Sequence, residues 1–511
     1  MYLNRLPEPL LYKISGMKKF SLTLMYISLA IHCYSQEKNY NVLIILVDDL
    51  RPALGVYSDP IAISPKIDEW AKEAMVFERA YSNQAVCVAS RYNLLLGARS
   101  TSTGLYDFGR AFRDHYSDAV TLPELFKKNG YHTAAIGKVF HVGHNTYNDE
   151  RSWSVPHWYD KVVEYASPGH RSETREEALF SNKSWQEANS LEKGHAWERL
   201  DVEDGAYADG RVSKEAISRL EELRKDGEPF FLAVGFARPH LPFTVPKKYW
   251  DLYDPSALSL PSVVKNPIGA PKFSVKRDGE ISQYSEIPLS SNSDPFSDGL
   301  TRTLIHGYYA GVSYVDAQIG KVLDYLKSSG QDRNTIVVLW GDHGYLLGEM
   351  GMWTKHVNYE LANRIPLIIR HPEMEEGTHT MGFVETVDIY PTLAALARLE
   401  LPHSGQPLDG RSFAEYLLGR GGRLRESVYH CFPRDGMMGR AIRDMKYRLV
   451  EWDPIIGTGP TTYELYHYKN GLVETENIWT ENHPAFVRLK AVLDSHPQPV
   501  PPRPESKPRE R

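Results

Sequence analysis

Short, nearly continuous apolar runs recur along the chain, and helical patterns fill several of the segments between them. Residues 41–47 form the clearest run, because branched apolar residues make up most of it. This pattern is typical of a strand buried on both faces of a parallel sheet. Comparable runs cover residues 75–77, 132–136, 230–236, 335–340 and 366–369. The alternation of buried strands with helices predicts an α/β fold with a doubly wound, mainly parallel sheet.

The predicted helices have clear start and stop signals. Ser64 and Pro65 suit the N-cap and first turn of one helix, and others are expected over residues 122–129, 213–224 and 304–326. Residues 145–205 and 262–300 have no steady periodicity. We expect both to be long surface insertions, the first with loops over the functional site.

The composition and segment lengths of the sequence change toward its C-terminal end. Beyond about Gly410, shorter segments at 427–432 and 447–452 predict a small antiparallel sheet packed on the main domain. We therefore expect a catalytic domain over residues 36–410 and a C-terminal subdomain over 411–495. The tail over 496–511 is rich in proline and charge and is expected to be disordered.

Residues 1–35 have the pattern of an export signal, with Met17 a better start than Met1. Lys18 and Lys19 precede an apolar run that is too short for a permanent membrane anchor. We expect a periplasmic or secreted protein without a transmembrane anchor, and rank a lipoprotein attached through Cys33 second. The net charge of −6 gives no basic field to attract nucleic acid.

Polar side chains follow many of the predicted strands. They are Asp48, Asp49, Lys138, His141, Arg238, His240, Asp342, His343 and, on the loop beyond the last of these strands, Lys355. Ligand sites in open α/β sheets lie at the carboxyl ends of the strands. Adjacent carboxylates there favour a hard divalent cation. The sequence therefore predicts one site at this edge that combines a metal with several cationic side chains.

Cys87 and Arg91 add a second feature, four residues apart on a predicted helical face. The stretch Cys87-Val88-Ala89-Ser90-Arg91, closed by Leu96-Gly97, resembles the type I sulfatase signature Cys-x-Pro-Ser-Arg followed by Thr-Gly. Ala89 and Leu96 depart from that pattern. Asp-Asp-Leu-Arg-Pro, Gly-Lys-Val-Phe-His, Pro-His and Gly-Asp-His-Gly resemble further sulfatase motifs in the family's order. Leu105-Tyr106-Asp107-Phe108 is similar to the iduronate-2-sulfatase branch.

The resemblance implies an alkaline-phosphatase-like fold, one bound calcium and an enzyme that hydrolyses sulfate esters. Cys87 would be oxidised to formylglycine (3-oxoalanine) by a formylglycine-generating or anaerobic sulfatase-maturating enzyme, and its hydrate would be the nucleophile. The implied metal ligands are Asp48, Asp49, Cys87, Asp342 and His343. Arg91, Lys138, His240 and Lys355 would bind sulfate, and His141 would orient the hydrate. His240 or Lys355 would protonate the leaving oxygen.

The implied substrate is a sulfated glycan, with Tyr106, Asp107 and Arg238 as substrate contacts. We expect an exo-acting enzyme that removes a 2-O-sulfate from a terminal uronic acid, as in a glycosaminoglycan or the algal polysaccharide ulvan. Arg238 suits a carboxylate, although it is equally well a strand-end residue. A phosphate or phosphonate ester hydrolase and an inactive carbohydrate-binding relative remain open alternatives.

The two mature cysteines give conflicting expectations. An exported protein with only Cys87 and Cys431 would by default pair them in a disulfide. Oxidation of Cys87 to formylglycine requires instead that its thiol is free. The state of Cys87 therefore separates an active sulfatase from an inactive relative.

Overall fold

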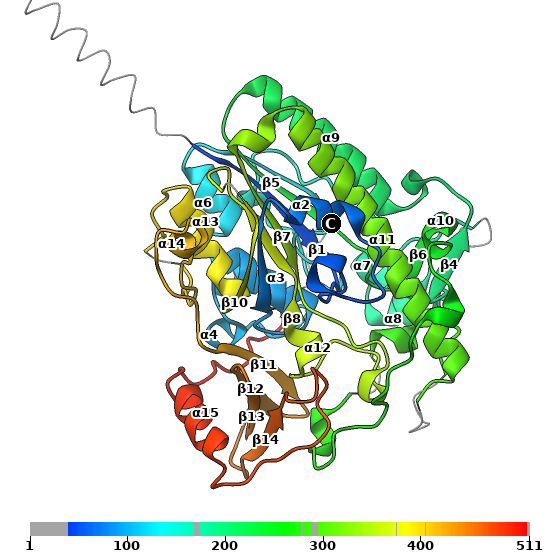
Figure 1. The fold of residues 1–511 in the computed structure, drawn as a ribbon, viewed down its shortest axis with the longest axis vertical. Coiled ribbons are helices and arrows are strands. Elements are labelled where there is room, and N and C mark those ends of the chain that lie inside the picture. Colours follow the sequence, from blue (N-terminus) through cyan, green and yellow to red (C-terminus); the bar gives the residue numbers. More distant parts are fainter. Residues whose placement is uncertain are drawn as a thin grey trace, which may run out of the picture. The chain divides into compact units, whose positions relative to one another are not determined.

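The computed structural model describes residues 39–167, 173–276, 279–288, 295–374, 376–403 and 405–507. The predicted signal peptide lies outside the described residues. The features below belong to the compact unit over residues 41–511. Figure 1 shows the central sheet of this unit with helices on both sides.

The central sheet has eight strands, in the order β10-β2-β9-β7-β1-β5-β3, with β8 paired to β2. Their bounds are β1 Asn41–Val47, β2 Met75–Tyr81, β3 His132–Gly137, β5 Phe230–Phe236, β7 Thr335–Gly341, β8 Arg364–Ile365, β9 Leu367–Arg370 and β10 Thr378–Glu385. The contacts of β1 with β5 and β7, and of β3 with β5, are parallel. Strand β9 runs antiparallel to β2 and β7. The prediction of a doubly wound, mainly parallel sheet is therefore confirmed.

Helices cover both faces of this sheet (Figure 1). On one face lie α2 Pro65–Ala71, α9 Ala208–Asp226 and α11 Asp298–Ser328. On the other lie α3 Cys87–Leu96, α6 Leu122–Lys128 and α13 Ile389–Leu396. Leu43, Ile45 and Val47 of β1 are buried in the same core cluster as residues of α9 and α11. The opposite face of β1 is buried as well, which explains its continuous apolar sequence.

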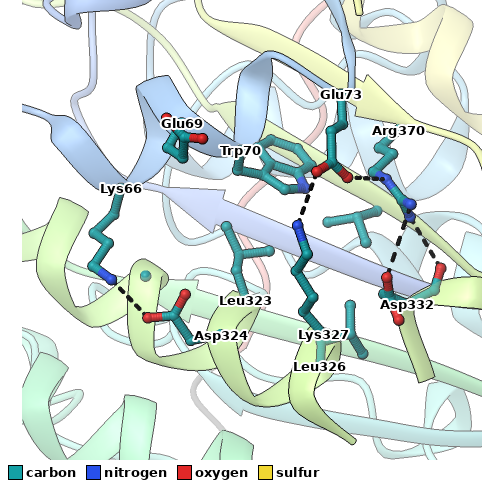
Figure 2. Close-up of a pocket in the computed structure, with 12 residues that line it drawn as sticks. Lys66, Glu69, Trp70, Glu73, Leu323, Asp324, Leu326, Lys327, Asp332 and Arg370 are labelled. Atoms are coloured by element: carbon teal, nitrogen blue, oxygen red, sulfur yellow. Dashed lines mark hydrogen bonds and ion pairs between the residues drawn. The ribbon is translucent and has the colours of Figure 1, made fainter. Parts of the chain in front are cut away.

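Ion pairs link helices α2 and α11 across a surface groove of about 120 Å³. Lys66 of α2 pairs with Asp324, and Lys327 of α11 pairs with Glu73 just beyond α2 (Figure 2). Arg370 of β9 also reaches Glu73. Because the charges in this groove are already paired with one another, they serve to join the two helices and the sheet.

The smaller sheet has four antiparallel strands, in the order β11-β12-β13-β14. They are β11 Val428–Arg434, β12 Met437–Arg443, β13 Tyr447–Pro454 and β14 Thr462–His467, and α15 Pro484–Asp494 packs on them. This sheet matches the expected C-terminal antiparallel element. The short helices α4 Ser100–Thr103, α5 Phe112–His115, α10 Lys247–Trp250, α12 Glu360–Asn363 and α14 Ala414–Leu417 complete the main unit.

The first long insertion has more structure than its sequence pattern indicates. It contains α7 Arg175–Phe180, α8 Trp185–Asn189 and β4 Trp197–Leu200, which pairs with β6 Phe243–Pro246. Capping boxes at Thr174 and Ser184 start the two short helices. Tertiary contacts therefore stabilise elements that are too short to show a helical period.

The described part of the tail, which the sequence predicts to be disordered, makes backbone hydrogen bonds with residues 101–109. Backbone N–H groups of Val500, Arg503 and Ser506 donate to carbonyl groups of Thr101, Gly104 and Gly109, at 2.7 to 2.9 Å. Proline has no N–H to donate, but the residues between the prolines do. The tail therefore packs as an extended segment along residues 101–109, as far as residue 507.

Candidate active site

The carboxyl ends of four adjacent parallel strands bring the predicted site residues together. Val47 of β1 is in register with Phe236 of β5 and Gly341 of β7, so the residues that follow them are neighbours. At the end of β3, Gly137 has a φ of +72°, and a Cβ there would lie 2.1 Å from the Gly235 carbonyl oxygen. Glycine is therefore required for the chain to turn so close to β5 and place Lys138 in the site.

A buried group of potential metal ligands lies at this edge. One ligand atom from each of Asp48, Asp49, Cys87 and His343 lies within 4.8 Å of the others. Asp342 adjoins the group, because its Oδ1 accepts hydrogen bonds from the backbone N–H groups of Asp49 and His343 at 3.0 and 2.9 Å. Four of the five predicted ligands thus converge, and the fifth orients two of them.

Burial and neighbouring charges shift the pKa values of the carboxyl groups at this edge. Burial raises the pKa of Asp342 well above its usual range, and the charge of Asp48 raises it further. Burial also acts to raise the pKa of Asp48, but the charges of Lys138, His240 and Arg91 outweigh it and hold this pKa well below its usual range. A divalent ion among these side chains would favour the charged form of every carboxyl. The carboxylates suit calcium, whereas His343 is a softer ligand.

Arg91 lies in a different place from the one its predicted role requires. Its guanidinium is fully buried, with Nε 3.1 Å from Asp342 and Nη2 3.2 Å from Asp48. Nη1 donates to the carbonyl groups of Lys138 and Val139. The arginine therefore holds two metal-site carboxylates and the loop after β3, and it presents no free N–H group to a sulfate.

Three other predicted cationic groups surround Cys87. Lys138 contacts Asp48, and Lys355 Nζ lies 2.9 Å from Asp49 and 2.9 Å from Glu280. His240 Nε2 lies 3.0 Å from Glu280. Its Nδ1 lies against the Leu241 carbonyl group, so both ring nitrogens face oxygen atoms.

The thiol of Cys87 is at the centre of this arrangement. It is buried and free, and so is Cys431. The default expectation of a disulfide is therefore wrong. His343 Nε2 lies 3.3 Å from its Sγ. Burial and the charge of Asp48 raise the pKa of the Cys87 thiol well above its usual value. An unmodified Cys87 would therefore be a poor nucleophile, because the thiolate is the reactive form.

A cavity of about 160 Å³ opens from Cys87. Its walls include His141, His240 and Lys355, which were predicted. They also include residues that the sequence pattern did not reveal, namely Phe108, His144, Glu176, Phe180, Trp185, Glu280, Gln283 and His356. Most of these come from the two long insertions. Among these, His144 has a sequence signal, because it follows His141 by three residues. Its Nδ1 lies 3.2 Å from His141 Nε2.

The three predicted substrate contacts do not line this cavity. The buried hydroxyl of Tyr106 donates to the Val500 carbonyl group at 2.8 Å. Arg238 is buried and donates to the carbonyl groups of His240 and Val162. Asp107 is exposed and accepts the N–H of Phe108 at 2.8 Å. Tyr106 and Arg238 therefore bond to backbone carbonyl groups of neighbouring loops in this structure.

Comparisons with known proteins agree with this geometry. The sulfatase family model matches residues 40–399, and the model of the N-sulphoglucosamine sulphohydrolase C-terminal region matches residues 348–496. Human iduronate 2-sulfatase is 30% identical over an alignment of 516 positions, gaps included, that covers 86% of this chain and 91% of that protein. An ulvan-active sulfatase from Formosa agariphila is 29% identical over 388 residues, covering 74% of this chain and 65% of that protein.

Solved structures share the fold. BT4656 in complex with D-glucosamine-2-N,6-O-disulfate has a TM-score of 0.68 at 22% identity and covers 90% of this chain and 96% of its own. The phosphonate monoester hydrolase from Silicibacter pomeroyi has a TM-score of 0.65 at 21% identity, covering 89% and 94%. The extent of the family match, together with the convergence of its motif residues on one cavity, shows that this chain belongs to the sulfatase family.

Proposed function

We propose that this sulfatase depends on calcium and on formylglycine at position 87, and that it removes sulfate from glycans. The observation that carries this proposal is that Cys87 is one of four converging potential metal ligands and also lines a cavity with Lys355 and His240. Lys138 contacts Asp48 of the same group. The carboxylates suit a hard cation, and the cationic side chains suit a sulfate group. The raised pKa of the Cys87 thiol supports a modified side chain as the nucleophile.

The ligands that would hold calcium are Asp48, Asp49, residue 87 and His343, with Asp342 fixing the backbone beside them. When bound there, calcium would supply positive charge next to residue 87 and the sulfate group. Lys138 and Lys355 add positive charge where negative charge grows in the transition state. His141 lies on the cavity wall, where it is suited to orient the hydrated aldehyde.

His240 is the better of the two candidate acids for the leaving oxygen. Its ring lines the cavity, with Nε2 3.0 Å from Glu280 and Nδ1 against the Leu241 carbonyl group. Lys355 is held by both Asp49 and Glu280, an arrangement that favours its charged form and a role in binding. We therefore assign proton donation to His240 and sulfate binding to Lys355.

Within the glycan class we propose exo-acting hydrolysis of a 2-O-sulfate on a terminal uronic acid. The similarity to iduronate 2-sulfatases over most of the chain supports this. Residues of both long insertions line the cavity of about 160 Å³ that opens from Cys87, as expected for a pocket that receives a chain end. Likeness to phosphonate monoester hydrolases concerns the fold alone, and it leaves that activity as the second candidate.

We also propose that the protein is exported and matured by a formylglycine-generating or anaerobic sulfatase-maturating enzyme. The pattern in residues 1–35 and the free, buried Cys87 support this. No helix in the part of the chain that the structure describes is long and apolar enough to cross a bilayer.

The test is sulfate release from defined oligosaccharides by protein produced together with a maturation enzyme. We expect faster release from a terminal 2-O-sulfated uronic acid than from the same residue inside a chain. Faster hydrolysis of phosphate or phosphonate esters than of any sulfate ester would contradict the proposal.

A further inference from the structure

Two buried acceptor atoms on the cavity wall have no hydrogen-bond donor. They are Oε1 of Glu176, on α7, and Oε1 of Gln283, and neither has a partner among the described residues. Glu176 is only 3% exposed, and both residues line the cavity that contains Cys87. Buried polar atoms are almost always paired, since leaving one unpaired is costly. Two such atoms on one wall indicate a ligand that brings its own donors.

An aromatic ring completes this wall. Trp185, at the start of α8, is 57% exposed although it lines the same cavity. The Arg175 guanidinium lies 5.8 Å from its ring centroid, and the His144 ring lies 6.3 Å away. An exposed indole that lines the same cavity as two unpaired polar atoms adds an apolar surface to a polar one. A sugar ring has the complementary surfaces, with C–H groups on its face and hydroxyl groups at its rim.

We propose that Glu176, Gln283 and Trp185 form the binding subsite for the sugar ring that carries the sulfate. Glu176 and Gln283 hydrogen-bond to its free hydroxyl groups, and Trp185 packs against one face of the ring. This inference rests on the proposed function, because it names how that same site recognises its substrate. In this proposal, residues of the two insertions determine substrate specificity, and the strand-end residues carry out the reaction.

The charge state of Glu176 fits this role. Burial raises its pKa to about 8, and the negative charge of Glu280 acts in the same direction, while Arg175 and Lys355 oppose it. Near neutral pH the carboxyl group therefore keeps its proton, so it both donates and accepts hydrogen bonds. A neutral wall does not repel an anionic sulfate ester.

The first test measures binding without turnover. In a Cys87→Ala background, calorimetry would compare two probes, a disaccharide with a terminal 2-O-sulfated uronic acid and one with a terminal sulfated glucosamine. Adding Glu176→Ala or Trp185→Ala should weaken binding of the better probe about 3- to 10-fold, the range for losing one neutral contact. The conservative changes Glu176→Gln and Trp185→Phe should keep most of the affinity, and unchanged melting temperatures would show that each variant folds.

The second test uses the matured enzyme and a small aryl sulfate, which has a sulfate group but no hydroxyl-bearing sugar ring. Glu176→Ala should lower kcat/KM for the disaccharide more than that for the aryl sulfate, which brings no hydroxyl group to this carboxyl. Equal losses on both substrates, or disaccharide affinity that does not depend on either residue, would overturn the subsite. If the wild-type enzyme cleaves no sulfate ester while disaccharide binding still depends on Glu176, the proposed function fails and the subsite stands.

Discussion

Removing the buried charge of Arg91 should destabilise the protein in a way that calcium repairs. Arg91→Met leaves Asp48 and Asp342 without the guanidinium that now lies 3.2 and 3.1 Å from them. Breaking one side of a buried ion pair costs about 3–5 kcal/mol. We therefore expect the free energy of unfolding, measured by denaturant titration with a chelator present, to fall by about that amount.

Calcium distinguishes this site from an ordinary buried ion pair. A saturating ion stabilises the folded state by about 2.7 kcal/mol at a hundred times its Kd. Because Arg91→Met removes a positive charge next to the proposed ion, calcium should stabilise the variant more than it stabilises the wild type. We expect Arg91→Met to change the affinity for sulfate less than it changes the free energy of unfolding, because Arg91 faces carboxylates and carbonyl groups.

Arg448→Met is the matched control. Arg448 is fully buried and pairs with Glu360 at 2.7 Å and Glu474 at 3.3 Å, outside the candidate site. The Arg448→Met variant should lose a similar amount of unfolding free energy. Calcium should stabilise this variant no more than it stabilises the wild type. The reasoning fails if Arg91→Met costs no more than an ordinary surface change, about 0.5 kcal/mol. Equal extra stabilisation of both variants by calcium would refute it as well.

Three further predictions concern the nucleophile, the metal and the coupling of stability to pH. Cys87→Ser should lower kcat of the matured enzyme by several orders of magnitude, because the aldehyde cannot form, and near-normal rates would contradict its role. Chelation should abolish sulfate release and calcium should restore it better than zinc, whereas recovery with two zinc ions per chain would favour the phosphatase-like alternative. Burial acts to raise the pKa of Glu385, but the charges of Arg425 and Arg99 hold it at about 2, below the ordinary 4.5. The stability that Glu385 contributes relative to Glu385→Gln should therefore be full above pH 4.5 and shrink as the pH falls toward 2, and a difference in unfolding free energy that stays constant would contradict this.

Much of the fold could be predicted because buried strands have a strong local signal. The apolar run before Asp48 identified β1, and the polar residues after β3, β5 and β7 identified the edge that holds the site. The position of β9, antiparallel between β2 and β7, has no comparable signal. The sequence of its four residues, Leu367–Arg370, fits a parallel strand and an antiparallel strand equally well, because tertiary contacts decide the direction of pairing.

The walls of the site could not be predicted for a related reason. Glu176 and Glu280 come from insertions without periodicity, so only the folded chain shows that they face the cavity. Arg238 and Tyr106 were expected to contact the substrate, but they do not line the cavity. Each lies near catalytic motifs in the sequence, yet each side chain bonds to backbone carbonyl groups of neighbouring loops. Proximity along the chain was therefore a poor guide to the direction of a side chain.

The central claim is that Cys87 becomes the nucleophile through conversion to formylglycine. Mass spectrometry of the tryptic peptide over residues 80–91, from protein active on a sulfate ester, tests this most directly. We predict an aldehyde in place of the thiol, detected by the mass of the peptide and by its reaction with a hydrazide. A fully unmodified thiol in active enzyme, or a disulfide between Cys87 and Cys431, would contradict the account.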